Sequence, residues 1–349
     1  MSNHFVPHKP PIPILNKSNM NPTERKTVKR NLNIDTLFRK NYYKTDSTHF
    51  LYTLPEPINN VVSMKITSVE IPYVWYTFSA ANQSNEFTIH IYNYVDPILM
   101  SQNATLTPQT FSQVFQIPEG NYGSAELITA MNNYFSNLAG VFSYFYFDVE
   151  DTSSKCIIRL KTFLESSSAY DELVKNSGPD FYFEVDFRIQ SDPTRPIYKN
   201  AGWMLGFKHP LYKVVYDISG IHNYIYLNNG KQNYRYYLMG ESSYGNSMFN
   251  YFFIDVDDFH KNYSTNMHLS STVDSYIGNT IMGRVQVISG FNTILTNTSN
   301  DFVFKTREYF GPIKLEKLAI RIINRFGDVM NINGNDYSML LEIEQLYSQ

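Results

Sequence analysis

The chain has 349 residues, a formal net charge of −3, a hydrophobic fraction of 43% and a single cysteine, Cys156. This length and apolar content predict a folded protein with a sizeable core, and one cysteine excludes an intrachain disulfide scaffold. Charged residues make up only 17% and aromatic residues 16%, which is typical of a surface that is largely buried against partners. The sequence shows neither a signal peptide nor an apolar run long enough for a transmembrane segment.

The first 45 residues are predicted to form an extended, basic N-terminal arm. Five prolines oppose a regular helix or a paired strand here, at Pro7, Pro10, Pro11, Pro13 and Pro22. The net charge of the whole chain gives no electrostatic case for nucleic-acid binding, so we interpret the arm as a segment that binds protein, with nucleic acid as the disfavoured alternative. Its candidate partner-binding residues are Arg25, Lys26, Lys29, Arg30, Arg39 and Lys40.

From about residue 48 the apolar residues alternate with a period of two, which is typical of β-strands. The alternation in residues 61–72 slips once near Thr67 and Ser68, which indicates a β-bulge. A polar turn between residues 145–149 and 156–160 predicts a hairpin. Further strands are predicted at 86–92, 181–187, 223–227, 234–238, 250–256, 281–288, 302–306, 315–323 and 338–344, the last two as a hairpin-like pair that closes a sheet.

A helix is predicted over residues 124–138, because Ser124 is a suitable N-cap, Glu126 lies in the first turn and apolar residues recur at helical spacing. A second helix is predicted at 168–176. Strands outnumber helices, and the connecting stretches are too short for repeated crossover helices. The sequence therefore predicts a mainly β fold, as an antiparallel sandwich or barrel.

No group of residues in the sequence has the spacing of a catalytic or metal site. The run from Asp255 through Asp257 and Asp258 to His260 holds metal-ligating residue types, but it lacks the glycine and the later glutamate of a calcium loop. The histidines do not have zinc-site spacing, and Cys156 lies in an alternating strand where a buried thiol is expected. The sequence thus predicts no catalytic, cofactor-binding or metal-binding residues and a protein that is not an enzyme.

Four segments, in this order along the chain, carry a resemblance to a known group of proteins. They are residues 33–50, residues 59–72, residues 117–123 at the start of the predicted helix, and residues 318–343. Together they resemble the minor capsid and penton-type structural proteins of nucleocytoplasmic large DNA viruses, the giant-virus group. The resemblance spans most of residues 33–344 and is weakest at about 190–300.

This resemblance implies an antiparallel jelly-roll β-sandwich with one or two inserted helices. The arm would occupy residues 1–45 and the sandwich domain residues 46–349, with an insertion around 190–300. The implied function is that of a non-enzymatic component of an icosahedral virus capsid, located in the virion and assembled in the host cell cytoplasm, which cements major-capsid capsomers. Expected partners are the major capsid protein and other minor capsid proteins, with a homo-oligomer as a further option. A penton position and a position beneath the facets both stay open.

A carbohydrate-binding β-sandwich, such as a fibre or lectin-like module, is the alternative function. Trp75 and Trp203, if exposed beside Asn and Asp residues, would stack on sugar rings and bond to their hydroxyl groups. The position of the aromatic residues separates the two functions. A concave patch bordered by Asp and Asn favours sugar binding, whereas aromatic residues spread over several faces favour assembly.

Overall fold

The computed structural model describes residues 26–95, 107–161, 165, 180–215, 224–227, 230–233, 236–245, 250–263, 271–272, 275–276, 278–288, 290–298 and 305–347. The strands are β1 (Thr27–Asp35), β2 (His49–Pro72), β3 (Glu86–Tyr94), β4 (Gln109–Gln116), β5 (Phe145–Val149), β6 (Lys155–Leu160), β7 (Tyr182–Asp186), β8 (Leu211–Val215), β9 (Tyr224–Leu227), β10 (Gly230–Asn233), β11 (Tyr237–Ser243), β12 (Tyr251–Asp257), β13 (Ser271–Thr272), β14 (Ser275–Tyr276), β15 (Ile281–Gln286), β16 (Ile294–Thr298), β17 (Arg307–Ile323) and β18 (Ser338–Leu346). The helices are α2 (Ser124–Ser136) and α4 (Ala201–Met204), with 3-10 turns η2 (Thr36–Phe38), η3 (Tyr42–Lys44), η4 (Gly140–Tyr144) and η6 (Ile197–Lys199). The strands of every described ladder run antiparallel, which confirms the predicted mainly β, antiparallel class.

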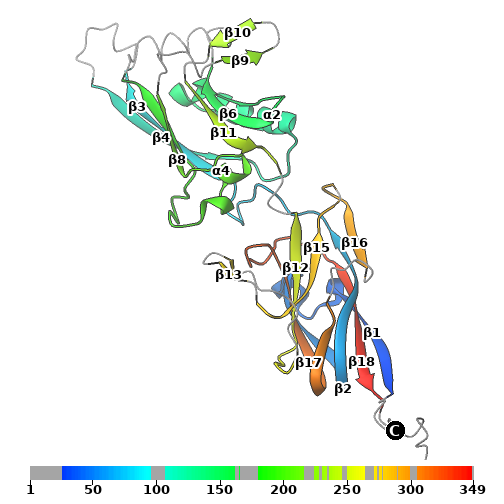
Figure 1. Ribbon diagram of the computed structural model, residues 1–349. Helices are drawn as coiled ribbons and strands as arrows, with labels where there is room; N and C mark the ends of the chain where they lie inside the picture. The colour runs from blue at the N-terminus through cyan, green and yellow to red at the C-terminus, as the bar shows by residue number, and fades with distance from the viewer. Residues whose placement is uncertain are drawn as a thin grey trace, which may run out of the picture.

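The elements form two lobes (Figure 1). We call the body of β1, β2, β12, β15, β16, β17 and β18 the sandwich lobe, and the body of β3 to β8, β11, α2 and α4 the second lobe. The chain leaves the sandwich lobe after β2 and returns to it at β12. This differs from the insertion expected around 190–300, because β12, β15 and β16 lie in that range and yet pair within the sandwich lobe.

Strand β2 belongs to both faces of the sandwich lobe. Its first half pairs with the end of β17, which pairs with β12, and β12 pairs with β15. Its second half pairs with β18 and β16, and β18 pairs with β1. The two faces bury their alternate side chains against each other, as in the jelly-roll sandwich implied by the resemblance. Buried residues of this core include Val61, Met64, Ile66, Val69, Phe252, Ile254, Val256, Leu318, Ile320, Ile322, Leu341 and Ile343.

Two irregularities let β2 pass from one face to the other. Leu340 pairs with Ser68 and Leu341 pairs with Ile66, so Thr67 is the extra residue of a bulge, where the sequence predicted one. Asn60 has a φ of 57°, in the left-handed region that asparagine tolerates, at a second register shift. The bulges supply the bend that a single long strand needs to serve two sheets.

The predicted hairpin-like pair of residues 315–323 and 338–344 is not formed. These segments are β17 and β18, and β2 lies between them in the sheet. The connection after β17 makes its own turn, in which the Asn324 side chain accepts hydrogen bonds from the backbone N–H groups of Phe326 (2.8 Å) and Asp328 (3.1 Å). This turn folds the chain back on the end of β17 only briefly, through a bridge between Ile323 and Val329, before the chain continues to β18 on the other side of β2.

Residues 27–35, which the sequence analysis assigned to the arm, form an edge strand. Strand β1 pairs with β18 along its whole length, and Ile34 is buried in the core. The two exposed cations of β1 protect this sheet edge, because charged side chains oppose pairing with a strand of another chain. Residues 1–25 of the predicted arm, including Arg25, lie outside the described residues.

The second lobe packs a sheet of β4, β3, β7 and β8 and a sheet of β11, β6 and β5 around phenylalanine side chains. The predicted hairpin is confirmed as β5 and β6. The predicted helix is confirmed as α2, although its N-cap is Gly123 rather than Ser124, and the Glu126 carboxylate accepts the Gly123 N–H at 2.6 Å. The helix predicted at 168–176 lies outside the described residues. Within the described ranges, no helix is both long and apolar enough to cross a membrane.

Candidate functional site

A loop of residues 36–46, which we call the Arg39-centred loop, leads from β1 to β2. The Arg39 guanidinium donates hydrogen bonds to three carbonyl oxygens of this loop, those of Thr36 (2.8 Å), Tyr42 (3.2 Å) and Thr45 (3.1 Å). Only 6% of the Arg39 side chain is exposed. One buried cation therefore fixes the backbone of the loop from inside.

Asp336, in the turn before β18, anchors this loop to the sandwich lobe. Its carboxylate accepts hydrogen bonds from Arg39 Nη1 (2.5 Å), Thr36 Oγ1 (2.9 Å) and Tyr42 Oη (2.8 Å). The Tyr42 ring lies 4.0 Å from the Arg39 guanidinium carbon, and its hydrogen bond to Asp336 raises the pKa of the phenol. The first and fourth segments of the resemblance thus meet in one hydrogen-bonded cluster.

The Arg39-centred loop exposes apolar side chains although its backbone is fixed. Phe38 is 81% exposed, Tyr43 is 98% exposed and Leu37 is 52% exposed. Lys40 and Lys44 are also exposed, the first between Phe38 and Tyr43 in the sequence and the second directly after Tyr43. Phe and Tyr side chains are enriched at protein interfaces relative to the rest of the surface.

The predicted partner-binding cations fall into different environments. Lys29 and Arg30 are exposed on β1 and Lys26 is exposed directly before it, and Lys29 forms an ion pair with Glu342 of β18 at 2.8 Å. Lys40 is exposed on the Arg39-centred loop. Arg39 points inward and is used within the chain, so it positions the loop rather than contacting a partner.

The third segment of the resemblance, residues 117–123, holds both passages of the chain between the lobes. The Asn121 carboxamide accepts hydrogen bonds from Thr77 N (2.7 Å) and Thr77 Oγ1 (2.6 Å) and donates to the Trp75 carbonyl (2.8 Å). On the returning passage, the Tyr244 hydroxyl donates to the Tyr122 carbonyl at 2.8 Å. This segment therefore has a structural use at the lobe junction.

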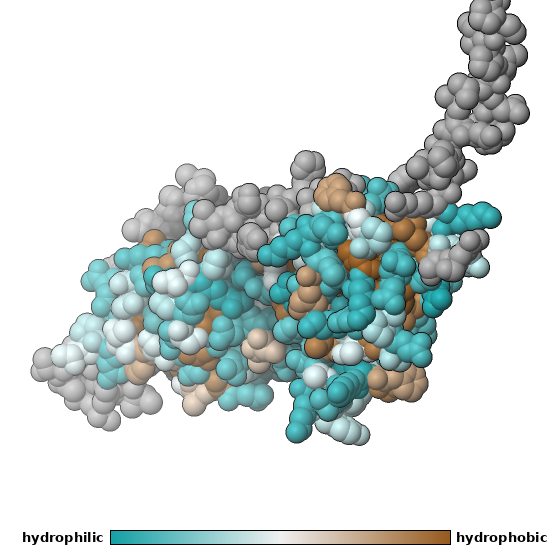
Figure 2. Space-filling model, turned by 90° about the horizontal axis from the view of Figure 1, so that it is seen from below, coloured by the Kyte–Doolittle hydropathy of each residue, from teal (hydrophilic) through white to brown (hydrophobic). Residues whose placement is uncertain are grey.

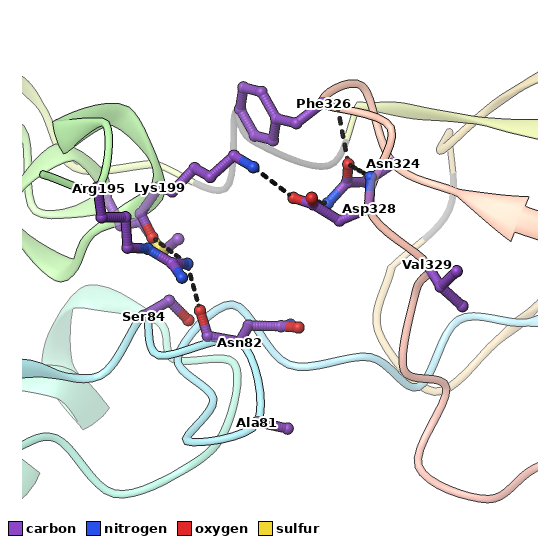
Figure 3. Close-up of a pocket in the computed structure, with 10 residues that line it drawn as sticks. Ala81, Asn82, Ser84, Arg195, Lys199, Asn324, Phe326, Asp328 and Val329 are labelled. Atoms are coloured by element: carbon purple, nitrogen blue, oxygen red, sulfur yellow. Dashed lines mark hydrogen bonds and ion pairs between the residues drawn. The ribbon is translucent and has the colours of Figure 1, made fainter. Parts of the chain in front are cut away.

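A pocket of about 250 Å³ lies between the lobes (Figure 3). Across it, Lys199 of the second lobe forms an ion pair with Asp328 of the sandwich lobe at 2.7 Å. The Tyr198 ring stacks on Phe326 with 5.1 Å between ring centroids. Arg195 donates to the carbonyl of Asn82 and to the Gln83 side chain, and burial lowers the pKa of its guanidinium. The Lys199–Asp328 ion pair and the Tyr198–Phe326 stacking thus join the two lobes at this pocket.

The polar side chains between Asp255 and His260 form hydrogen bonds within the chain. Asp258 accepts hydrogen bonds from Arg307 (2.9 Å) and from the Tyr309 hydroxyl, and Asp255 pairs with Arg321. The Asp257 carboxylate accepts the Phe259 N–H at 2.8 Å. Among the described residues, no three His, Cys, Asp or Glu side chains are grouped to hold a metal ion. Cys156 is buried, which raises the pKa of its thiol.

For two buried tyrosines of the sandwich lobe, we expect replacement by phenylalanine to have opposite effects on the free energy of unfolding. The Tyr337 hydroxyl is buried without a hydrogen-bond partner among the described residues, whereas the Tyr309 hydroxyl donates to the buried Asp258. Tyr337→Phe should leave the free energy of unfolding unchanged or raise it by up to about 1 kcal/mol, and Tyr309→Phe should lower it by about 1–3 kcal/mol. Urea denaturation of the two variants and the parent measures both. Equal losses would contradict the assigned hydrogen bonds.

Comparisons with known proteins find solved structures that are similar to this chain. No protein-family model and no curated protein matches it. A crystal structure of the mavirus penton protein is similar with a TM-score of 0.43 and 11% identity, over 93% of this chain and 100% of that chain. A chain in the cryo-EM structure of the Sputnik virophage is similar with a TM-score of 0.35 and 14% identity, over 92% of this chain and 98% of that chain. The first of these proteins is by its name a penton protein, the class that the four segments resemble, but at these TM-scores neither likeness assigns a family or a role to this chain.

Proposed function

We propose that the chain is a non-enzymatic structural component of an icosahedral virus shell, which binds and cements neighbouring shell proteins. The observation that supports the proposal is the structural role of the four segments that carry the resemblance. Asp336 joins the first to the fourth, and Asn121 and Tyr122 of the third hold the lobe junction. Residues 59–72, the second segment, form the half of β2 that turns from one face to the other. All four segments therefore serve to build the fold.

The surface supports assembly more than sugar binding. Exposed large apolar residues occur on several elements, among them Phe38 on the Arg39-centred loop, Ile294 on β16 and Phe310 on β17. Figure 2 shows separate apolar patches on one face of an otherwise hydrophilic surface. Apolar residues on several elements, rather than in one concave patch, are what contacts with several neighbours would use.

The two tryptophans lend little support to the carbohydrate-binding alternative. Trp75 is 1% exposed and belongs to the core, so its ring has no access to a sugar. The Trp203 ring is covered by the Lys208 ammonium group, whose nitrogen lies 3.7 Å from the ring centroid. A sugar platform needs a free aromatic face. Trp75 has none, and Lys208 occupies one face of Trp203.

We propose the major capsid protein and other minor capsid proteins as partners, within a virion assembled in the host cytoplasm. The proposal also includes a homo-oligomer, and it includes both a penton position and a position beneath the facets. The exposed cations Lys26, Lys29, Arg30 and Lys40, together with Arg25, would face carboxylates or carbonyl groups of these neighbours. Arg39 is left out of this set because its guanidinium is used internally.

The proposed function predicts that the chain is found in purified particles at a fixed ratio to the other shell proteins. Quantitative mass spectrometry measures that ratio, and chemical cross-linking on intact particles identifies the neighbours. Cross-links are expected between β1 or the Arg39-centred loop and other shell proteins. A chain that is absent from washed particles, or present in a ratio that varies between preparations, would contradict the proposal.

A chain that lacks residues 1–25 tests the predicted arm. The deletion stops before β1, because a longer one would remove an edge strand that pairs with β18. The shortened chain is expected to unfold at the same urea concentration as the parent and to enter particles less efficiently. Normal incorporation of the shortened chain would show that the arm is dispensable for assembly.

A further inference from the structure

The Arg39-centred loop buries a charged guanidinium, which costs free energy, and exposes apolar side chains to water. Burial of a guanidinium needs a full set of acceptors. The loop supplies three carbonyl oxygens, and the turn before β18 supplies the Asp336 carboxylate. The rings of Phe38 and Tyr43 remain almost fully in water. Their exposed area adds little to the stability of the sandwich lobe, so the order of the loop calls for another explanation.

We propose that this loop is a docking element, which inserts the Phe38 and Tyr43 side chains into an apolar pocket with a carboxylate rim on a neighbouring shell protein. The inference deepens the proposed function and rests on it, because it names the surface and the chemistry of its partner. Phe38 lies at the end of η2 and Tyr43 within η3, and Arg39 and Asp336 hold both turns.

Preorganisation gives such a loop its advantage. A flexible segment loses conformational freedom when it binds, whereas a loop that is already fixed binds without that loss. The Asn41 backbone is in the left-handed region with a φ of 59°, and its carbonyl accepts the Lys44 N–H at 2.8 Å, which closes the turn that contains Tyr43. The rings are therefore presented by a backbone with few alternative conformations.

The charge of the loop points to an acidic protein surface as the occupant. Lys40 and Lys44 are exposed and have no ion pair within the part of the chain that the structure describes, while the Arg39 charge is matched by Asp336. Asp46 is the exposed carboxylate of the loop, so the outward-facing charge is positive. A single-stranded nucleic acid would need a row of cations along its backbone, and two exposed lysines and an aspartate on one loop do not supply it.

The double variant Phe38→Ala/Tyr43→Ala tests the inference, with Phe310→Ala as a matched control. Phe310 is also 81% exposed, but it lies on β17 outside the loop. The double variant should unfold at the parental urea concentration and fall about tenfold or more in its ratio to other shell proteins in purified particles. Phe310→Ala should unfold like the parent and lower incorporation clearly less than the double variant, because it removes a single ring outside the loop. Incorporation of the double variant at the parental level would overturn the inference.

A photo-crosslinking residue, p-benzoylphenylalanine, at position 38 identifies the occupant. In intact particles it should cross-link to another shell protein, at a peptide that contains apolar residues and Asp or Glu. A cross-link to a second copy of this chain would overturn the assigned partner. Binding of the purified chain to poly(dT) or to phosphatidylserine vesicles that is lost in the double variant would overturn it in favour of nucleic acid or membrane. If the parental chain itself is missing from particles, the proposed function fails, which separates that failure from failure of the docking inference.

Discussion

Replacement of Asp258 by alanine is expected to lower the free energy of unfolding by about 3–5 kcal/mol, because it leaves the Arg307 charge buried without its carboxylate. The side chain of Asp258 is 0% exposed and that of Arg307 is 4% exposed, with 2.9 Å between their charged groups. Arg307 also donates to the Thr280 carbonyl at 2.8 Å, which keeps the guanidinium in place when its partner is lost. Urea denaturation followed by far-UV circular dichroism measures the loss.

The adjacent carboxylate provides the control for this variant. Asp257 accepts a single backbone hydrogen bond, from Phe259, and Asp257→Ala should cost only about 1 kcal/mol. A double variant, Asp258→Leu/Arg307→Met, removes both charges and should recover part of the stability lost in Asp258→Ala. If Asp258→Ala unfolds like the parent, the buried pair does not exist as described.

Replacement of Leu341 by alanine should destabilise the protein by about 2–5 kcal/mol, because the core of the sandwich lobe closes only partly around the space that is left. Leu341 and Ile343 of β18 and Ile320 and Ile322 of β17 are all fully buried, on the two strands that flank β2. Ile320→Ala should have a similar effect from the other flanking strand. Both are measured by urea denaturation.

Leu51 of β2 is the control for core truncation, because its side chain is 51% exposed on the outside of the same lobe. Leu51→Ala should change the free energy of unfolding by about 0.5 kcal/mol or less. Equal effects of Leu51→Ala and Leu341→Ala would mean that the assignment of inward and outward residues in these strands is reversed.

Local patterns in the sequence predicted the elements that depend on near neighbours. Alternation of apolar and polar residues correctly predicted that Ile320, Ile322, Leu341 and Ile343 are buried. A one-residue slip in that alternation correctly predicted the bulge at Thr67. Helical spacing found α2, and turn chemistry found the hairpin of β5 and β6. In each case the physical cause acts within a few residues along the chain.

The arrangement of the strands could not be predicted in the same way. Alternation shows which side of a strand is buried, but it does not show which strand lies beside it. Strands β17 and β18 follow one another and looked like a pair, yet β2 separates them. The extent of the second lobe depends on the same long-range pairing, because β12 rejoins the sandwich lobe only through β15 and β17.

The role of Arg39 was also beyond local patterns. In the sequence it is one cation among several, and its partner Asp336 lies 297 residues later. The one available signal was the run of Phe38, Tyr42 and Tyr43 around it, since aromatic residues without alternation do not suit a strand. Only the fold shows that Arg39 points inward and that Phe38 and Tyr43 point outward.

The shared strand β2 has a consequence for the order in which the protein folds during its synthesis. Thr67 of β2 bonds to Leu340 of β18 across 273 residues of sequence, so β2 must wait for partners that the ribosome makes much later. The ladders of the second lobe need only residues from β3 to β11, which are complete earlier. The second lobe is thus able to fold while β2 is still unpaired. In that interval the apolar side of β2 is open to aggregation, and chaperones that bind extended apolar segments would have their target there.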